Sequence, residues 1–579
     1  MATVYDFIIV GSGPAGTALA ASLAASVKKP KILIIEAGGE NDDKNLRVDG
    51  QRWITFHNQD MNWGYKTAPQ EHCANRELDY SRGLGLGGSS AVNFSVFNVG
   101  SKGDYDEWAR MVGDDTYKWT HMQRRFKDLE TFDPKLPVGV GKKYAAPKAE
   151  DHGTSGPLKT GYSREVERDV VPMLDLFEEA GFPLNLDHNS GNPIGMSLAI
   201  SSSSKGVRSS AIDLLTPVPE NVTVLTRSPV QRIILKGKRA IGVESNGKKY
   251  LASKEVILAG GSLNNPKLLM HSGIGPKEEL NKFGIPVVKD VPVIGKGLRD
   301  HMFVPLVFQR TEGDTDRQAF YGDKKAQEEA LVQWKKDGTG PWSKFGCGMG
   351  IGWFKLDNLV RLQEFHDLPV AEKNLLTHPT VPHYELISHF PFHYFMPDFP
   401  DNLLNYSCLT VFLYNAQSRG EVTLQSADPD APPRIDPKFL STAYDRRVAV
   451  EALRDVFRLV RYEGYARDNV APITAPRSES DADLLDYWRN NIGSSWHMTG
   501  TVKMGNPADP EAAVDKDFRL MGFDGLRVAD MSVVPILANC HVQSVAYLVG
   551  MTAAEKLIAE YGLNQTGTGF KRSTPREHL

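Results

Sequence analysis

Asp6-Phe-Ile-Ile-Val-Gly-Ser-Gly-Pro-Ala-Gly16 is the part of the chain that most narrows its fold class. The first five residues are a short apolar run, which predicts a β-strand buried on both faces. Gly11, Gly13 and Gly16 follow at once, and Thr17 to Ala25 then has the Ala- and Leu-rich composition of a helix. Strand, glycine turn and helix in this order bring backbone N–H groups and a helix N-terminus to a position where they can bind a pyrophosphate.

A second apolar strand, Lys31 to Ile35, leads into an acidic residue, Glu36, which lies 20 residues beyond Gly16. At that spacing a carboxylate can accept hydrogen bonds from the ribose hydroxyls of a dinucleotide. Glycines also occur in ordinary tight turns, but a mere turn leaves Glu36 at the end of the second strand unexplained. The sequence therefore predicts an α/β, Rossmann-like domain that binds a dinucleotide.

Length and composition limit what the rest of the chain can be. At 579 residues it exceeds what one hydrophobic core usually supports, so we expect two domains. The net charge of −4 gives no electrostatic case for binding nucleic acid or an anionic membrane. The four cysteines share no metal-like spacing, which predicts reduced thiols and no metal site.

The two ends of the chain bear on its location. The N-terminus runs directly into the first strand without the features of a secretory signal, and no stretch approaches the roughly 18–20 apolar residues of a membrane span. We therefore expect a soluble, cytoplasmic protein without a membrane partner. The final Glu577-His-Leu matches the small-basic-Leu peroxisomal signal only in part, because Glu577 stands where a small residue belongs. The polar residues 565–579 predict a flexible tail.

A long glycine-rich stretch, Arg82-Gly-Leu-Gly-Leu-Gly-Gly-Ser-Ser-Ala-Val-Asn93, indicates which dinucleotide is bound. With this stretch the chain resembles the glucose–methanol–choline (GMC) oxidoreductase family, whose first signature centres on a Gly-Gly-Ser-Ser-x-x-Asn element. The second family signature is matched by Gly260 to Pro276. Further matches, which extend the resemblance over almost the whole chain, are Asn62 to Tyr65, Arg208 to Ala211, Val293 to His301 and Gly525 to Pro535.

The resemblance implies that the cofactor is FAD. Some family members attach the flavin through a histidine directly before the signature asparagine, and here that position is Val92. An apolar side chain cannot form this bond, so we predict non-covalent, dissociable FAD. The residues that match the family's cofactor site are Gly11, Gly13, Gly16 and Glu36 for the adenosine half, Val230 for the adenine, Gly88, Ser89 and Asn93 for the pyrophosphate, ribityl chain and ring, and Asp530 for the C-terminal contribution to the flavin.

The resemblance also implies the architecture. The family fold combines a Rossmann-like FAD-binding α/β domain, assembled from discontinuous segments, with a substrate-binding domain of antiparallel sheet and flanking helices. We expect the FAD-binding domain to comprise residues 1–155, 222–305 and 505–564. The substrate-binding domain would then comprise residues 156–221 and 306–504.

Two histidines near the end of the chain are candidates for the chemistry: His497 in Ser-Ser-Trp-His-Met-Thr-Gly and His541 in Asn-Cys-His-Val-Gln-Ser. Taken alone, His497 fits a structural hydrogen-bonding residue in a strand end or loop. His541, with Asn539 and Gln543, fits the capping of a helix start. Family members, however, carry a catalytic histidine in a His-x-x-Gly-Thr/Ser context and a second histidine or asparagine near the start of the last helix. The resemblance therefore implies that both histidines are catalytic.

The second histidine also indicates a branch of the family. The chain fits the two-histidine branch that includes glucose and aryl-alcohol oxidases. Around Cys540 it is also similar to fungal formate oxidase, which has arginine where His541 stands. The fixed fork of an arginine suits a carboxylate substrate, whereas histidine suits a neutral hydroxyl.

Together these features predict FAD-dependent oxidation of a primary or secondary alcohol, with oxygen or a quinone as acceptor. We expect His497 to remove the hydroxyl proton while hydride passes to flavin N5, and His541 to orient the hydroxyl; an exchange of the two roles is open at this level. The alternative is a non-redox lyase or cyclase, since related proteins on this fold keep flavin without redox chemistry.

The segment His383 to Phe399 is unusually rich in aromatic side chains and histidines. It predicts either an aromatic wall for an apolar or aromatic alcohol, or a core strand and loop of the substrate domain. Its histidines have no tight ligand pair with a second cluster, so we expect no metal there.

Overall fold

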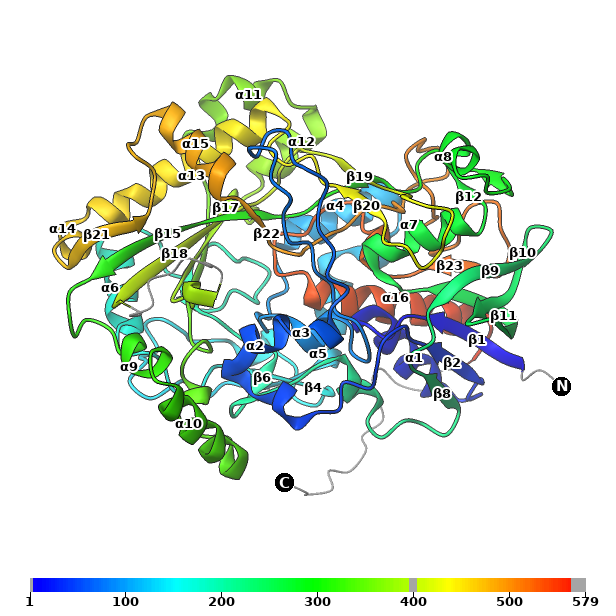
Figure 1. The fold of residues 1–579 in the computed structure, drawn as a ribbon, viewed down its shortest axis with the longest axis horizontal. Helices are drawn as coiled ribbons and strands as arrows, with labels where there is room; N and C mark the ends of the chain where they lie inside the picture. The colour runs from blue at the N-terminus through cyan, green and yellow to red at the C-terminus, as the bar shows by residue number, and fades with distance from the viewer. Residues whose placement is uncertain (1–3, 395–403, 564–579) are drawn as a thin grey trace.

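The structure is a computed structural model that describes residues 4–394 and 404–563. The predicted tail at 565–579, with Glu577, lies outside these residues, as does the end of the aromatic segment at 395–399. No helix within the described residues is both long and apolar enough to cross a membrane. Two large sheets lie side by side, one built around the N-terminal strand and the other around the middle of the chain (Figure 1).

The first sheet forms around the strand that the sequence places at the start of the chain. Parallel pairing joins its central strands, and an antiparallel hairpin extends one edge. Ile8, Ile9 and Ile34 are fully buried, as expected for parallel strands that are covered on both faces. The strands, in spatial order, are β8 (Val222–Leu225), β2 (Ile32–Ile35), β1 (Val4–Val10), β11 (Lys248–Leu258), β10 (Arg239–Ser245) and β9 (Val230–Lys236), and β23 (Leu526–Val528) pairs in parallel with the end of β11.

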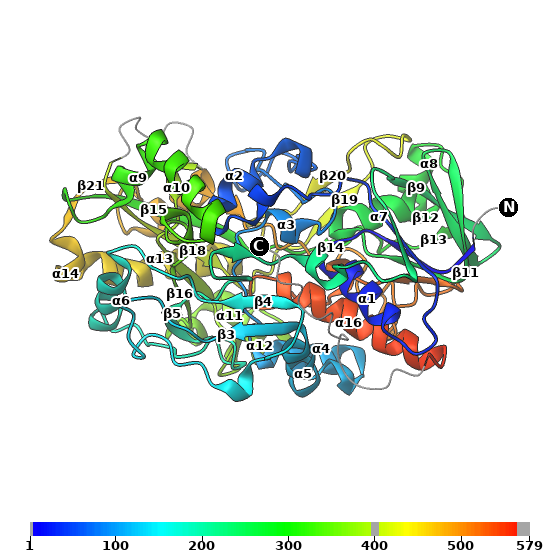
Figure 2. The ribbon, with the colours of Figure 1, turned by 90° about the horizontal axis from the view of Figure 1, so that it is seen from below.

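Two helices pack closely against each other beside this sheet. α1 (Pro14–Ala24) begins directly after the glycine turn, and α16 (Gln543–Glu560) lies alongside it in both views (Figures 1 and 2). The close approach depends on Gly550, because a Cβ at that position would overlap the carbonyl oxygen of Ala15. The first residues of both helices line the same cavity, so two helix N-termini, with their unpaired N–H groups, meet there.

The second sheet is antiparallel throughout. One of its strands, β15, crosses the domain boundary that we placed at residue 305, and the division into two domains stays a prediction. In spatial order the strands are β21 (Asn469–Thr474), β15 (Met302–Arg310), β18 (Tyr406–Leu413), β17 (Tyr384–Ser388), β16 (Gly350–Phe354) and β5 (Gly195–Leu198), and β22 (Gly493–Ser494) also pairs with β15.

The two-residue alternation along β17 and β18 sends side chains to opposite faces of this sheet. Leu386 and Leu409 belong to the core beneath helix α13 (Ala443–Arg461). Glu385 and Phe412 are directly opposite each other in the register and point to the other face. That face is turned toward the cavity and carries the side chains that complete the site.

Candidate active site

A cavity of about 550 Å³ runs from the glycine turn after β1 to the two predicted catalytic histidines. Gly11, Gly13 and Glu36 line one end, and His497 and His541 line the other. The predicted cofactor residues Gly88, Ser89, Asn93, Val230 and Asp530 also belong to its wall. The structure thus brings these residues together around one elongated space.

The glycines shape the end of the cavity nearest α1. Gly11 has a φ of +101°, and a Cβ at Gly16 would overlap the carbonyl oxygen of Gly11, so both must lack a side chain for the turn to close. Gly88 packs against the same turn, where its Cβ would lie 2.8 Å from Gly13 Cα. A Cβ at Gly13 would meet no atom of the described residues within 4 Å. Gly13 therefore leaves room for a pyrophosphate to approach the start of α1.

Glu36 is held at the cavity wall by backbone groups. One carboxylate oxygen accepts from Ser12 N at 2.9 Å and from Ser12 Oγ at 2.7 Å, and the other accepts from Gly38 N at 3.0 Å and Gly85 N at 3.1 Å. These bonds join the glycine turn to the second glycine-rich stretch. The residue stands where the sequence predicts a ribose contact, and that contact stays a prediction.

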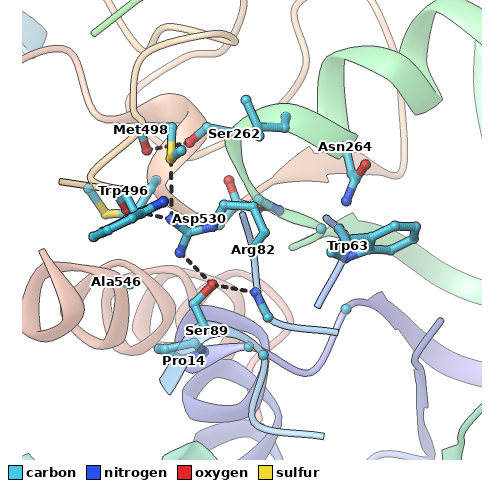
Figure 3. A pocket seen from close by; sticks show the side chains of 18 of the residues that line it. Pro14, Trp63, Arg82, Ser89, Ser262, Asn264, Trp496, Met498, Asp530 and Ala546 are labelled. Atoms are coloured by element: carbon cyan, nitrogen blue, oxygen red, sulfur yellow. Dashed lines mark hydrogen bonds between the residues drawn. The ribbon is translucent and has the colours of Figure 1, made fainter. Parts of the chain in front are cut away.

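Further along the cavity, Arg82 connects its own glycine-rich stretch with the segment that contains Trp496 and Met498 (Figure 3). Its guanidinium donates to Ser89 Oγ and to the carbonyl oxygen of Trp496, and one nitrogen lies 3.2 Å from Met498 Sδ. Burial lowers the pKa of Arg82, and the negative charge of Asp300 opposes this. A partly buried cation is thus fixed in the wall between the predicted cofactor end and the histidines.

Two other predicted cofactor residues anchor helices at the cavity. Asp530 accepts hydrogen bonds from Gly261 N and Asn265 Nδ2 of α7 (Gly261–His271) at 2.5 and 2.7 Å. The Asn93 amide donates to Gln543 Oε1 at the start of α16. The donor Nε2 of Gln543 is buried and has no partner among the described residues, which fits the binding of a polar ligand at this helix start. Open space at Gly13, two helix N-termini and this amide together fit the FAD that the sequence predicts.

His497 is fixed through its backbone. It follows β22, and its N–H donates to Asp300 Oδ1 at 2.7 Å, while Ser494 Oγ donates to the other oxygen of that carboxylate at 2.5 Å. Burial raises the pKa of Asp300 to about 6. The preceding residue, Trp496, has a φ of +58°, an uncommon conformation for a bulky side chain. The chain is therefore constrained to present the His497 ring at this place.

A third histidine contacts His497. His301 Nδ1 lies 3.0 Å from His497 Nδ1, and the His301 ring stacks on Tyr414 with ring centroids 3.9 Å apart. Burial holds the pKa of both histidines well below the ordinary value, and nearby positive charge adds to the effect. The surroundings of His497 therefore favour its neutral form over the imidazolium.

His541 faces His497 across the cavity end, with ring centroids 4.9 Å apart and ring planes at 81°. Its Nε2 lies 2.8 Å from Glu385 Oε1, and its backbone N–H donates to Asn98 Oδ1. Glu385 is fully buried and also accepts a hydrogen bond from the Tyr414 hydroxyl. Burial, together with the charge of Glu385, raises the pKa of Tyr414 well above its usual value, so this phenol stays a donor.

The polar residues around His541 do not cap the last helix. α16 begins after Val542, and no side chain caps it. Asn539 instead bonds Asp104 and Asn415, and His541 bonds Glu385, so capping does not account for the polar residues before this helix. His497 does make structural hydrogen bonds, but it also lines the cavity.

The aromatic segment is in part a core strand and in part cavity wall, while its contact with an alcohol stays a prediction. β17 is an internal strand of the second sheet, while Ile387 and Phe390 line the cavity. Its histidines point elsewhere: His383 bonds the backbone of Leu356 and Leu376, and His389 pairs with Asp169.

Sequence reasoning gave no role to Glu385, His301 or Tyr414. A signal was present for the first, because Glu385 is the one charged residue in the apolar strand Tyr-Glu-Leu-Ile-Ser, all of it buried. His301 belongs to one of the matched family segments but was not singled out.

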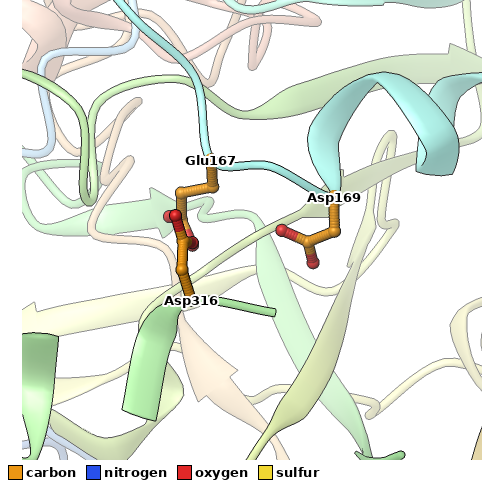
Figure 4. A group of neighbouring side chains, drawn as sticks. All are labelled: Glu167, Asp169 and Asp316. Atoms are coloured by element: carbon orange, nitrogen blue, oxygen red, sulfur yellow. The ribbon is translucent and has the colours of Figure 1, made fainter. Parts of the chain in front are cut away.

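A cluster of three carboxylates lies outside the cavity wall. Glu167, Asp169 and Asp316 approach one another closely enough to share a cation (Figure 4). Arg317 Nε is 2.7 Å from Glu167, His389 Nε2 is 3.2 Å from Asp169, and Lys344 pairs with Asp316. Basic side chains therefore already contact each carboxylate, and we assign no metal to the cluster.

Comparison with known proteins identifies the family. A family model described as GMC oxidoreductase matches residues 5–303, and a second one matches residues 416–550. The chain is 32% identical to glucose methanol choline oxidoreductase atC of Aspergillus terreus, over 96% of this chain and 93% of that protein. It is 31% identical to pyranose dehydrogenase 3 of Leucoagaricus meleagris, over 96% of this chain and 93% of that protein. A variant of formate oxidase from Aspergillus oryzae has a similar structure, with a TM-score of 0.87 and 26% identity, over 97% of this chain and all of that chain.

The chain therefore belongs to the GMC oxidoreductase family, and it is an FAD-dependent oxidoreductase. The predicted family and the predicted fold class, a Rossmann-like α/β sheet combined with an antiparallel sheet, are confirmed, whereas the domain boundaries stay a prediction.

Proposed function

We propose that this enzyme oxidises a primary or secondary alcohol to the carbonyl compound, with His497 as the base and His541 as the residue that orients the hydroxyl. Oxygen or a quinone would be the final acceptor. The observation that carries the proposal is the pair of imidazoles, 4.9 Å apart between ring centroids, in the wall of a cavity that begins at the glycine turn.

The hydrogen bonds of each ring leave one nitrogen for the substrate. Nδ1 of His497 is engaged by His301 and Ser495, so Nε2 is the atom that can take the hydroxyl proton. Nε2 of His541 is engaged by Glu385, so Nδ1 is the atom left for the substrate oxygen. When both nitrogens of His541 bear protons, Nε2–H donates to Glu385 and Nδ1–H holds the alcohol oxygen. Bound FAD supplies the hydride acceptor, N5, for the hydrogen of the α-carbon.

The cavity end at the histidines favours an apolar or aromatic alcohol. Its wall there is formed mainly by aromatic side chains: Phe56, Phe94, Phe303, Phe390, Phe412 and Trp496. A sugar would place several hydroxyls against this surface, and each buried hydroxyl without a partner costs about 1–3 kcal/mol. A planar aromatic alcohol would instead bury its ring among aromatic side chains and present one hydroxyl to the histidines.

We further propose that the FAD is held without a covalent bond. Val92 lines the cavity at the position where a histidine would be needed, and its side chain offers no nucleophile. For the FAD-binding segments we propose those predicted from the sequence. They contain the first sheet and α16, which build the glycine end of the cavity.

Anaerobic bleaching of the flavin tests the proposal. Benzyl alcohol, glucose and choline are mixed in turn with the purified holoenzyme, and we expect benzyl alcohol to bleach the oxidised spectrum with a kcat/KM at least about 100-fold above that of glucose. His497→Ala should lower the rate about 10²–10⁴-fold, whereas His366→Ala, at an exposed site, should leave it unchanged. A flavin that no alcohol bleaches would indicate the non-redox alternative and refute the proposal.

A further inference from the structure

His301 lies directly behind His497 and is itself fully buried. Its Nδ1 contacts His497 Nδ1 at 3.0 Å, and its ring stacks on Tyr414, the residue that donates to Glu385. The His301 ring thus contacts His497 directly, and it contacts the Glu385–His541 pair through Tyr414.

An antiparallel ladder keeps His301 and His497 in register. Arg299 and Thr499 exchange backbone hydrogen bonds at 3.0 Å, and Ser495 N donates to the carbonyl oxygen of His301 at 3.0 Å. The ladder continues into the pairing of β15 with β22. Because the backbone is paired on both sides of the contact, the sheet fixes the separation of the two main chains that carry these rings.

Ser495 shows which nitrogen carries the shared proton. Its hydroxyl donates to the carbonyl oxygen of His301 at 2.8 Å, and a carbonyl can only accept. The same oxygen lies 3.2 Å from His497 Nδ1, so toward that atom Ser495 can only accept. Nδ1 of His497 therefore carries the proton and faces two acceptors, Ser495 Oγ and His301 Nδ1. Nε2 of His301 has no partner among the described residues, whichever nitrogen of His301 is protonated. This atom therefore does not decide between the two tautomers of His301.

We infer that His301 is a positioning residue that accepts a hydrogen bond from His497 Nδ1–H and thereby keeps the unshared electron pair of His497 on Nε2, toward the alcohol. The inference rests on the proposed function and adds to it the residue that fixes the tautomer of the base. In a neutral imidazole one nitrogen is protonated, and the hydrogen bond at one nitrogen determines what the other presents.

The other ionisable groups around the pair are Glu385 of β17, Tyr414 directly after β18, His541 before α16, Asp300 before β15, and Arg82 of the glycine-rich stretch. Among them Asp300 contacts the backbone of His497 and not its ring. The protein contacts that determine which ring nitrogen of His497 is protonated are thus those with His301 and Ser495.

Nitrogen NMR of the holoenzyme labelled with ¹⁵N-histidine tests the tautomer without any substrate. Protonated and unprotonated ring nitrogens have well-separated shifts, and His497 is assigned from the signals that disappear in His497→Asn. We expect Nδ1 of His497 to be protonated and Nε2 unprotonated in the wild type. The reverse pattern would overturn the inference, even if alcohols bleach the flavin. The expected pattern would support the inference about the tautomer even if no alcohol bleaches the flavin and the proposed function fails.

Two substitutions of His301 test its effect on the reaction. His301→Leu removes the acceptor, and His301→Asn retains an oxygen acceptor near the position of Nδ1. We expect His301→Leu to lower the limiting rate of flavin reduction about 10- to 100-fold, to shift its pH profile and to change KM little, while His301→Asn stays within about fivefold of the wild type. Wild-type rates and pH profile in His301→Leu, with equal FAD content, would overturn the inference. If His301→Leu does not fold, a His301→Asn enzyme with unchanged FAD content that is slowed about 10- to 100-fold overturns the inference.

Discussion

Replacement of Glu385 by glutamine should impair flavin reduction while leaving the fold and the cofactor in place. The wild-type carboxylate accepts from His541 Nε2 at 2.8 Å and from the Tyr414 hydroxyl, and it is fully buried. The two donors contact different oxygens of the carboxylate, and glutamine has an NH2 group in place of one of them, so in the same position one donor loses its acceptor. In addition, the substitution removes the negative charge from the contact with His541.

The size of the effect follows from the lost charge. A hydrogen bond to a charged group contributes about 1.5–3 kcal/mol, and each 1.4 kcal/mol corresponds to a factor of ten in rate. Glu385→Gln should therefore slow flavin reduction by about 10- to 150-fold. Tyr414→Phe is the matched control, because it removes the other donor to the same carboxylate but leaves its charge, and it should slow the reaction about tenfold or less.

Anaerobic stopped-flow absorbance with benzyl alcohol measures these rates directly. FAD content and the thermal unfolding midpoint of each variant show whether the protein is intact. A Glu385→Gln enzyme that is reduced as fast as the wild type would refute the reasoning, as would a Tyr414→Phe enzyme that is slower than Glu385→Gln.

Three further predictions concern stability and the cofactor. Burial disfavours the charge of His152, but hydrogen bonds to two buried carboxylates raise its pKa from 6.5 to about 9, so protonation stabilises the fold fully below pH 6.5 and this stabilisation is lost as the pH rises through about 9. The unfolding midpoint of the wild type should thus exceed that of His152→Gln by more at pH 6 than at pH 9.5, and an equal difference at both would contradict it. Gly550→Ala should cost about 1–3 kcal/mol of stability because its Cβ overlaps α1, whereas Gly141→Ala, with open space around it, should cost almost nothing; equal unfolding midpoints would be the wrong result. Because of Val92, acid precipitation should release all flavin into the supernatant, and a yellow pellet would show a covalent bond.

The glycine end of the cavity could be predicted from the sequence because its determinants are local. Strand, turn, helix and Glu36 fall within one short segment, and each residue type is needed for a backbone reason: no Cβ at Gly11 and Gly16, an acceptor at Glu36. These contacts depend on neighbours in sequence, so their spacing carries the information.

The histidine end depends on sheet register, which a single sequence does not specify. Glu385 reaches His541 because β17 pairs with β18 so that Glu385 lies opposite Phe412. A shift by one residue would turn Glu385 into the core beneath α13. His301 meets His497 through a ladder between segments almost 200 residues apart, which no local pattern could show.

The central claim is that alcohol oxidation takes place at the two facing imidazoles, and a deuterium isotope effect tests it most directly. The holoenzyme and His497→Ala are each mixed anaerobically with benzyl alcohol and with its α-dideuterated form, and flavin reduction is followed by stopped-flow absorbance. We predict that deuterium slows reduction severalfold in the wild type and that the alanine variant reduces at least about 100-fold more slowly. A wild-type rate insensitive to deuterium under conditions where chemistry is rate-limiting, or an unimpaired His497→Ala, would contradict the account.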